Sequence, residues 1–190
     1  MRLRRPSRPV RRALLATAAA GLAVLAAAVW FGRPYPAVDP EAAAARLKTE
    51  AGRAYDEAGL PPGTAPLAGR VETGSCYHRG LRSLAHIDES RRDVHSFVLR
   101  WEVRGVSAAA AGAGQDRTRA RLAAAGWRLT SENVSDRGFR FEDPASGDTV
   151  SVDWYEPTGT YEVRAYAPCG RVPDGFDAYA WPSAEWHPER

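Results

Sequence analysis

Residues 127–167 read WRLTSENVSDRGFRFEDPASGDTVSVDWYEPTGTYEVRAYA, and this stretch decides the fold. Apolar and polar side chains alternate along it with a period of two, which is typical of strands buried on one face. Residues 97–103 alternate in the same way. The connections SDRG, DPASGD and PTGT are short and rich in turn-forming residues, so neighbouring strands must be antiparallel and form a meander. The predicted strands of the meander are 127–134, 138–142, 149–156 and 160–167.

Sorting these strand residues by parity gives one apolar face and one polar face. A sheet with one apolar face needs helices over that face, so the expected fold is an α+β domain, an antiparallel meander covered on one face by helices. The side chains expected to face the core are Trp127, Leu129, Phe139, Phe141, Val150, Val152, Trp154, Val163 and Ala165. Those expected to face outward are Arg128, Thr130, Arg140, Glu142, Ser151, Asp153, Tyr155, Glu162, Arg164 and Tyr166.

Two helices are indicated by the residues at their ends. Asp39 is a good N-cap, and the proline and glutamate that follow it suit a first helical turn. The helix is predicted to end before Gly59, which can adopt the left-handed conformation of a helix stop. Ser107 in the same way begins an alanine-rich helix that we expect to end at Gly126.

The chain begins with six arginines in its first twelve residues, followed by the uncharged, mostly apolar run 13–32. About 20 apolar residues can cross a hydrocarbon core of ~30 Å, and a basic flank stays on the cytoplasmic side. The pattern predicts a single-pass anchor in the cell membrane, with the N-terminus cytoplasmic and the C-terminal domain extracytoplasmic. The alanines at 26–28 also fit a signal-peptide cleavage site, which leaves a secreted soluble protein as the alternative.

The expected organisation of the chain follows from the position of the basic start and the apolar run. It comprises a cytoplasmic basic tail at 1–12, a transmembrane helix or signal peptide at 13–32, a stem, helix and linker at 33–70, an extracytoplasmic α+β domain at 71–170, and an aromatic, proline-rich tail at 171–190.

The charge of the exported part argues against a nucleic-acid partner. Six of the 26 basic residues precede residue 13, whereas all 23 acids follow it, so the remainder carries a formal net charge of −3. Nucleic-acid binding needs a positive field, which here lies at the cytoplasmic tail. The expected partners are the membrane and a protein or envelope component.

Two cysteines, Cys76 and Cys169, are the only ones in the chain. In an oxidising compartment an even count in a domain of this size predicts a disulfide. Two buried free thiols and a redox pair are the alternatives, and the second is disfavoured because the chain has no C-x-x-C motif.

Several short motifs give the chain a resemblance to other proteins. They are the arginine-rich start, the alanine- and leucine-rich anchor, WEVRGV at 101–106, AAGW at 124–127, VDW at 152–154 and APCG at 167–170. With 25 arginines and one lysine, the chain resembles small, uncharacterised membrane-anchored or secreted proteins of high-GC actinobacteria. The resemblance implies a location and a fold, and it transfers no activity.

Histidines and acids gather in one segment without matching a catalytic pattern. His78, His86, Asp88, Glu89 and His95 lie within 18 positions, but none of their spacings matches a zinc motif such as H-x-x-x-H. The chain also has no G-x-S-x-G nucleophile motif. We therefore predict no catalytic, metal or cofactor site. An envelope hydrolase that uses His78 or His86 with nearby acids is the alternative.

The outward sheet face is the better candidate for function. Arginine and tyrosine are enriched at recognition surfaces, although a solvated face of any arginine-rich protein has similar composition. The predicted partner-binding residues are Arg100, Arg128, Arg140, Tyr155, Arg164 and Tyr166. The aromatic tail, with Phe176, Tyr179, Trp181 and Trp186, either wraps the domain or forms a second contact surface. The expected function is a non-enzymatic, membrane-tethered binding module.

Overall fold

The structure is a computed structural model that describes residues 8–61, 69–133, 138–181 and 186, without the side chains of 8–16 and 18–20. The turn predicted at SDRG and most of the linker before residue 70 lie outside the described residues. The chain divides into two compact units, which are described separately. One comprises Met1–Tyr35 with Tyr77–Arg91, and the other Pro36–Cys76 with Arg92–Arg190.

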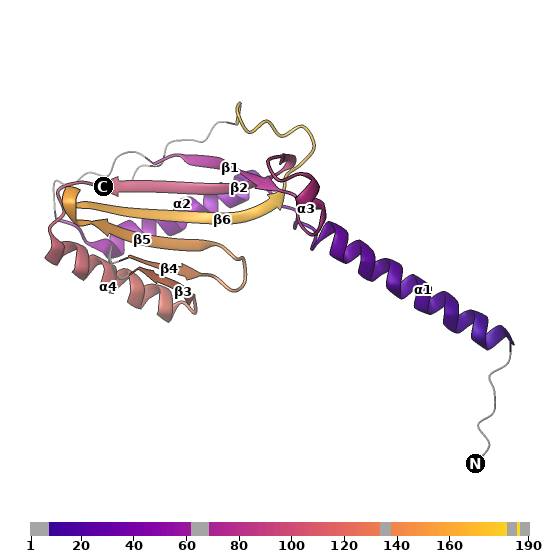
Figure 1. The fold of residues 1–190 in the computed structure, drawn as a ribbon. Helices are drawn as coiled ribbons and strands as arrows, with labels where there is room; N and C mark the ends of the chain where they lie inside the picture. The colour runs from indigo at the N-terminus through magenta and orange to yellow at the C-terminus, as the bar shows by residue number, and fades with distance from the viewer. Residues whose placement is uncertain (1–7, 62–68, 134–137, 182–185, 187–190) are drawn as a thin grey trace, which may run out of the picture. The chain divides into compact units, whose positions relative to one another are not determined.

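The second unit is built on a six-stranded sheet with strand order β1-β2-β6-β5-β4-β3 (Figure 1). The predicted meander is confirmed, because each strand from β3 to β6 pairs antiparallel with the next in the chain. The long strand β2 lies antiparallel to β6 and between β6 and the edge strand β1. The strands are β1 (Val71–Tyr77), β2 (Ser90–Val103), β3 (Arg128–Asn133), β4 (Gly138–Glu142), β5 (Thr149–Tyr155) and β6 (Thr160–Arg171).

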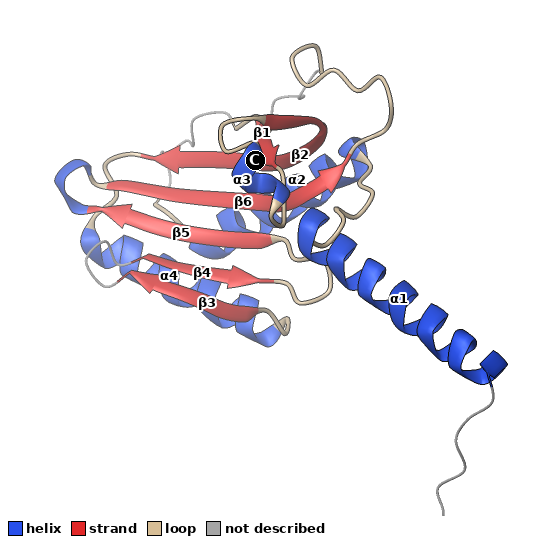
Figure 2. Ribbon diagram, turned by 45° about the vertical axis from the view of Figure 1, so that its right-hand side comes forward, coloured by secondary structure: helices blue, strands red, loops and turns tan. Residues whose placement is uncertain are grey.

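Two helices, α2 (Pro40–Ala58) and α4 (Ala108–Ala124), lie on the same face of this sheet (Figures 1 and 2). Their predicted ends are confirmed. The Asp39 side chain accepts a hydrogen bond from the backbone N–H of Glu41 at 3.0 Å, and Ser107 accepts one from Ala110 at 3.3 Å. Gly59 ends α2 in the left-handed conformation, with φ of 49°. The α+β class and the antiparallel sheet are therefore confirmed.

The core forms between the small side chains of α2 and the large ones of the sheet. Seven residues of α2, five of them alanines, are buried. Trp101 of β2 lies against the buried side of α2 and donates a hydrogen bond from Nε1 to the carbonyl oxygen of Ala51 at 3.2 Å. Tyr161 of β6 stacks on Trp101, with the ring centroids 6.0 Å apart. Because alanine occupies little volume, the helix backbone can approach the aromatic rings closely.

The contact between α2 and α4 depends on a glycine and an arginine. A Cβ at Gly114 would lie 2.8 Å from the carbonyl oxygen of Ala58, so only glycine allows the two helices to come this close. Arg117 of α4 donates hydrogen bonds to the carbonyl oxygens of Glu57 and Ala58 at 2.9 and 2.5 Å. These carbonyls belong to the last turn of α2, where no intrahelical donor remains.

One residue expected in the core is not there. Leu129 is 41% exposed, and every described residue of β3 is exposed, so the prediction for Leu129 is wrong. The pairing of β3 with β4 shifts between Leu129 and Ser131, and β3 is the edge strand of the sheet. Leu129 precedes the shift and is in register with the buried Phe141, so its side of the sheet was predicted correctly and only its burial was not. An edge strand has a neighbouring strand on one side only, which leaves its side chains with fewer packing partners. Trp127 packs against the core while only partly buried.

The predicted disulfide is confirmed. Cys76 of β1 is bonded to Cys169 of β6, with the Cα atoms 6.0 Å apart. Both strands are neighbours of β2, so the bond joins the two sides of that strand.

Three aromatic residues of the C-terminal tail, Phe176, Trp181 and Trp186, pack against the core of the second unit. Trp186 is buried and lies 6.4 Å from Trp101 between ring centroids, and its backbone pairs with that of Gly69. Trp181 contacts Phe97 at 5.5 Å between centroids. The tail was expected either to wrap the domain or to form a second contact surface, and the structure shows that these aromatic residues pack on the domain.

The first unit contains α1 (Arg8–Phe31), the short helix α3 (Arg82–Ala85) and the loop around α3. The predicted membrane span at 13–32 includes the positions 13–16 and 18–20, whose side chains are outside the described set. Within the part of the chain that the structure describes, no helix has both the length and the apolarity needed to span a membrane.

Candidate functional site

The candidate site is the sheet face opposite α2 and α4 (Figures 1 and 2). Strand pairing brings polar side chains on this face into rows that run across the strands, because residues in register lie beside each other. All six residues of the predicted partner-binding set have the parity of this face. They are Arg100, Arg128, Arg140, Tyr155, Arg164 and Tyr166.

Three arginines and a serine form one row. Arg100 of β2 is in register with Arg164 of β6, which is in register with Ser151 of β5, and Ser151 is in register with Arg140 of β4. Neighbouring strands lie about 4.8 Å apart, so the row extends over about 14 Å. Arg140 is exposed and forms no ion pair with any described residue. This row therefore places an arginine on three of the four strands that it crosses.

A row of acids lies next to the arginines. Glu102, Glu162 and Asp153 are in register on β2, β6 and β5. Glu162 is only 4% exposed although no helix covers it, because the side chains of Arg100 and Arg164 lie on either side of it. The distance from Arg100 Nε to the Glu162 carboxylate is 3.5 Å, and Arg164 forms a second ion pair with it. This buried carboxylate holds both guanidinium groups in place.

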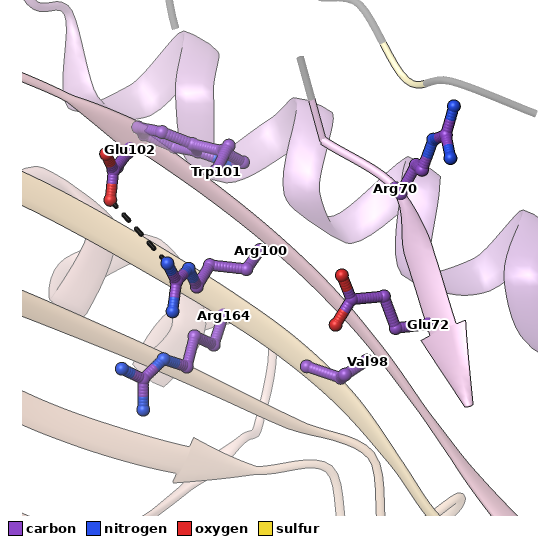
Figure 3. Close-up of a pocket in the computed structure, with 7 residues that line it drawn as sticks. All are labelled: Arg70, Glu72, Val98, Arg100, Trp101, Glu102 and Arg164. Atoms are coloured by element: carbon purple, nitrogen blue, oxygen red, sulfur yellow. Dashed lines mark ion pairs between the residues drawn. The ribbon is translucent and has the colours of Figure 1, made fainter. Parts of the chain in front are cut away.

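A groove of about 590 Å³ crosses this face near the β1 edge (Figure 3). Arg100 and Arg164 extend from neighbouring strands along one side of it, and Glu72 of β1 lies on the other. Arg100 also forms an ion pair with Glu102 at 3.8 Å. The groove is lined by both signs of charge and by Val98, and it is bordered by residue Trp101, whose side chain is buried. Such a lining is suited to a polar, extended ligand with acidic groups, because arginine pairs with carboxylates through two parallel hydrogen bonds.

The other predicted residues lie further across the sheet. Tyr166 is in register with Val98 and Thr149, and Arg128 on the edge strand forms an ion pair with Glu142 at 2.9 Å. Tyr155 is in register with Thr160 at the far end of β5. The six predicted residues therefore share a face without forming one compact pocket.

Some residues in or beside the groove have roles that the sequence did not predict. Glu162 belonged to the outward set, but its burial and its role between two arginines require knowledge of which strands pair. Arg70 and Glu72 were assigned no role, because no signal in the sequence places β1 beside β2. The C-terminal tail was the alternative contact surface. Its residues Trp181 and Trp186 pack on aromatic residues of the core, whereas Tyr179 is fully exposed.

A second cluster lies in the first unit. The structure brings His78, His86 and Glu89 together, with one ligand atom from each within 4.8 Å of the others. The two imidazole rings are 4.4 Å apart, and His86 Nδ1 lies 2.5 Å from the Glu89 carboxylate. Sequence spacing missed this group because a turn around α3, and not a helix face, brings the side chains together.

The electrostatics of this cluster favour the neutral form of His78 and the ionised form of Glu89. Desolvation lowers the pKa of His78, and the charges of His86 and Arg82 lower it further. The hydrogen bond from His86 lowers the pKa of Glu89. Two imidazoles and a carboxylate are a zinc ligand set, and the residues present fit such an ion. His95 is elsewhere, against Phe176, in the second unit.

Comparison with known protein families, with curated proteins and with solved structures finds no match to this chain.

Proposed function

We propose that this protein is a membrane-tethered extracytoplasmic module that binds a protein or envelope partner through its open sheet face. The observation that carries the proposal is the row of Arg100, Arg164 and Arg140 beside a groove on the sheet face opposite α2 and α4. Helices cover the other face, so the open face is the part of the sheet available to a partner. Arginine and tyrosine side chains are those most enriched in binding hot spots.

The tether is supported by the apolar run 13–32 and by the six arginines before it. The disulfide supports an oxidising compartment, since such bonds persist mainly outside the cytosol. Fractionation of expressing cells and the intact mass of the purified chain test this part. A membrane-bound chain of full mass is expected, and a soluble chain cut after Ala28 would replace the tether with secretion.

Site-specific photo-crosslinking tests the binding face. A photoreactive residue at Tyr166 should give a discrete adduct with a partner in intact cells, and Arg140→Ala should reduce that adduct at least fivefold. The matched control is the same photoreactive residue at Ala120, which is exposed on α4. Identical adducts from both positions, or adducts with this chain alone, would reject the open face as the binding surface.

The second candidate function is a hydrolytic metal centre, favoured by the convergence of His78, His86 and Glu89. A bound zinc ion would activate water at such a site, and the three side chains would hold the ion. Calorimetric titration with zinc should show one site that His78→Ala removes. His95→Gln is the control, because His95 lies outside the cluster. Equal zinc binding by both variants would exclude this site.

A further inference from the structure

A small cationic cavity lies in the first unit, directly after the last residue of α1. Its volume is about 210 Å³. Four arginines line it, together with Tyr35 and His78, and no acidic side chain among the described residues does so. The arginines are Arg33, Arg79, Arg82 and Arg91. A phosphate group is small enough to enter a cavity of this size.

Two glycines shape the cavity by letting the loop before α3 approach the end of α1. Gly32 and Gly80 have φ of 68° and 66°, which side chains other than glycine rarely adopt. A Cβ at Gly80 would lie 2.4 Å from the backbone nitrogen of Gly32. The backbone N–H of Leu81 donates a hydrogen bond to the carbonyl oxygen of Val29 at 3.1 Å. The approach of loop and helix therefore has specific backbone contacts.

Three of the four arginines that line this cavity have no acidic partner among the described residues. Within the described residues, Arg33, Arg79 and Arg82 form no ion pair with a carboxylate. The Arg79 guanidinium lies 3.7 Å from the centre of the Tyr35 ring, which orients it. The carboxylate of Glu89 is engaged by His86. Guanidinium groups gathered without acids form a site for an anion, and their planar forks suit phosphate oxygens.

Exposed apolar side chains lie close in sequence to the residues that line the charged cavity. Val29, Trp30 and Phe31 at the end of α1 are 58, 49 and 56% exposed. Leu81, Leu84 and Ile87, in and around α3, are 48, 69 and 71% exposed. Large apolar side chains exposed beside arginines are characteristic of a surface that enters the lipid interface, where aromatic rings and snorkelling arginines are favoured.

We propose that this cavity binds the phosphate of an anionic phospholipid headgroup in the extracytoplasmic leaflet. The inference rests on the proposed tether, because the cavity follows directly on the apolar run and so falls at the level of the headgroups. The arginines neutralise the phosphate, while Leu81, Leu84 and Ile87 contact the acyl boundary. The bound lipid would hold the loop around α3 against the membrane surface.

Native mass spectrometry of the full chain in neutral detergent micelles tests this site without requiring a bilayer. Phosphatidylglycerol is titrated against wild type and against Arg33→Gln/Arg82→Gln, because both side chains line the cavity and neither makes a hydrogen bond or an ion pair with a described residue. We expect the double variant to bind phosphatidylglycerol at least tenfold more weakly, since each arginine near an anionic surface contributes about fivefold. The charge-matched control, Arg53→Gln/Arg119→Gln in the second unit, should bind as wild type does.

Titrations with two other ligands identify which molecule binds in the cavity. Phosphatidylcholine should bind more weakly than phosphatidylglycerol, and inorganic phosphate at the same concentration should not displace the lipid. Displacement by phosphate would assign a free anion to the cavity and overturn the proposal, as would equal loss in the control variant. Cell fractionation reports on the tether separately, so a membrane-bound chain with unchanged lipid binding in Arg33→Gln/Arg82→Gln rejects the headgroup site and leaves the tether standing.

Discussion

The hydroxyl of Tyr161 is buried beneath the helices, and this burial has a measurable consequence. The side chain is fully buried, and neither its Oη nor the Oγ1 of Thr118 makes a hydrogen bond of normal geometry within the described residues. Burial raises the pKa of Tyr161 to about 12, against smaller opposing effects of the Thr118 hydroxyl and the Arg117 charge. The phenolate form is disfavoured because the core cannot solvate its charge.

This shift predicts a loss of stability at high pH. The pKa of Tyr161 is higher in the folded than in the unfolded state, so the folded protein retains a proton that the unfolded chain loses. The resulting stability is complete below about pH 10 and decreases by up to about 2–3 kcal/mol as the pH rises towards 12. Chemical denaturation at pH 9 and pH 11.5 measures it.

The control for this prediction is Tyr161→Phe, which keeps the ring and removes the titrating group. At neutral pH the variant should be as stable as wild type or slightly more stable, because the hydroxyl it loses has no partner. Its stability should decrease less than that of wild type between pH 9 and 11.5. The same decrease in both proteins would assign the effect to other groups.

The packing of α4 against α2 makes two glycines of one helix behave in opposite ways. Gly114→Ala should lower the free energy of unfolding by about 1–3 kcal/mol, because the added Cβ would lie 2.8 Å from the Ala58 carbonyl oxygen. Gly112→Ala should raise it by up to about 1 kcal/mol, because nothing lies within 4 Å of its added Cβ and alanine favours the helix. Urea denaturation of both variants measures the difference. A change of the same sign in both would contradict the close approach of the helices.

For the molecule as a whole, the disulfide links chain positions 93 residues apart. In the chain-entropy treatment, closing a loop of this length stabilises the folded state by about 4–5 kcal/mol. The double variant Cys76→Ser/Cys169→Ser should therefore lose about 3–5 kcal/mol in guanidinium denaturation. Reductant should reproduce the loss in wild type and leave the double variant unchanged. A wild type that is insensitive to reductant would show that the bond contributes little to stability.

Features that depend on neighbouring residues could be predicted from the sequence. The N-caps Asp39 and Ser107, the helix stop at Gly59 and the alternation in the meander each follow from hydrogen bonding or side-chain direction within a few positions. The pairing of Cys76 with Cys169 also required no geometry, because the chain has no other cysteine. These local signals were enough for the α+β class.

Features that depend on distant residues could not be predicted. The exposure of Leu129 on the edge strand, the position of β2 beside β6 and the tail tryptophans on the core are decided by competition among many possible contacts. The candidate sites show the same difference between features that depend on neighbouring residues and features that depend on distant ones. The six residues of the open face follow from parity, whereas the burial of Glu162 between two arginines follows from register.

From the amino-acid sequence alone we could predict two helices, the strands of the meander, the alternation of the two faces and the disulfide, because each follows from local chemistry or from the count of a residue type. Only the tertiary structure decided which strands pair, which polar residues lie beside one another and where cavities form. The physical reason is that a site consists of side chains brought together by packing, and the free energy of packing is shared among contacts distant in the chain.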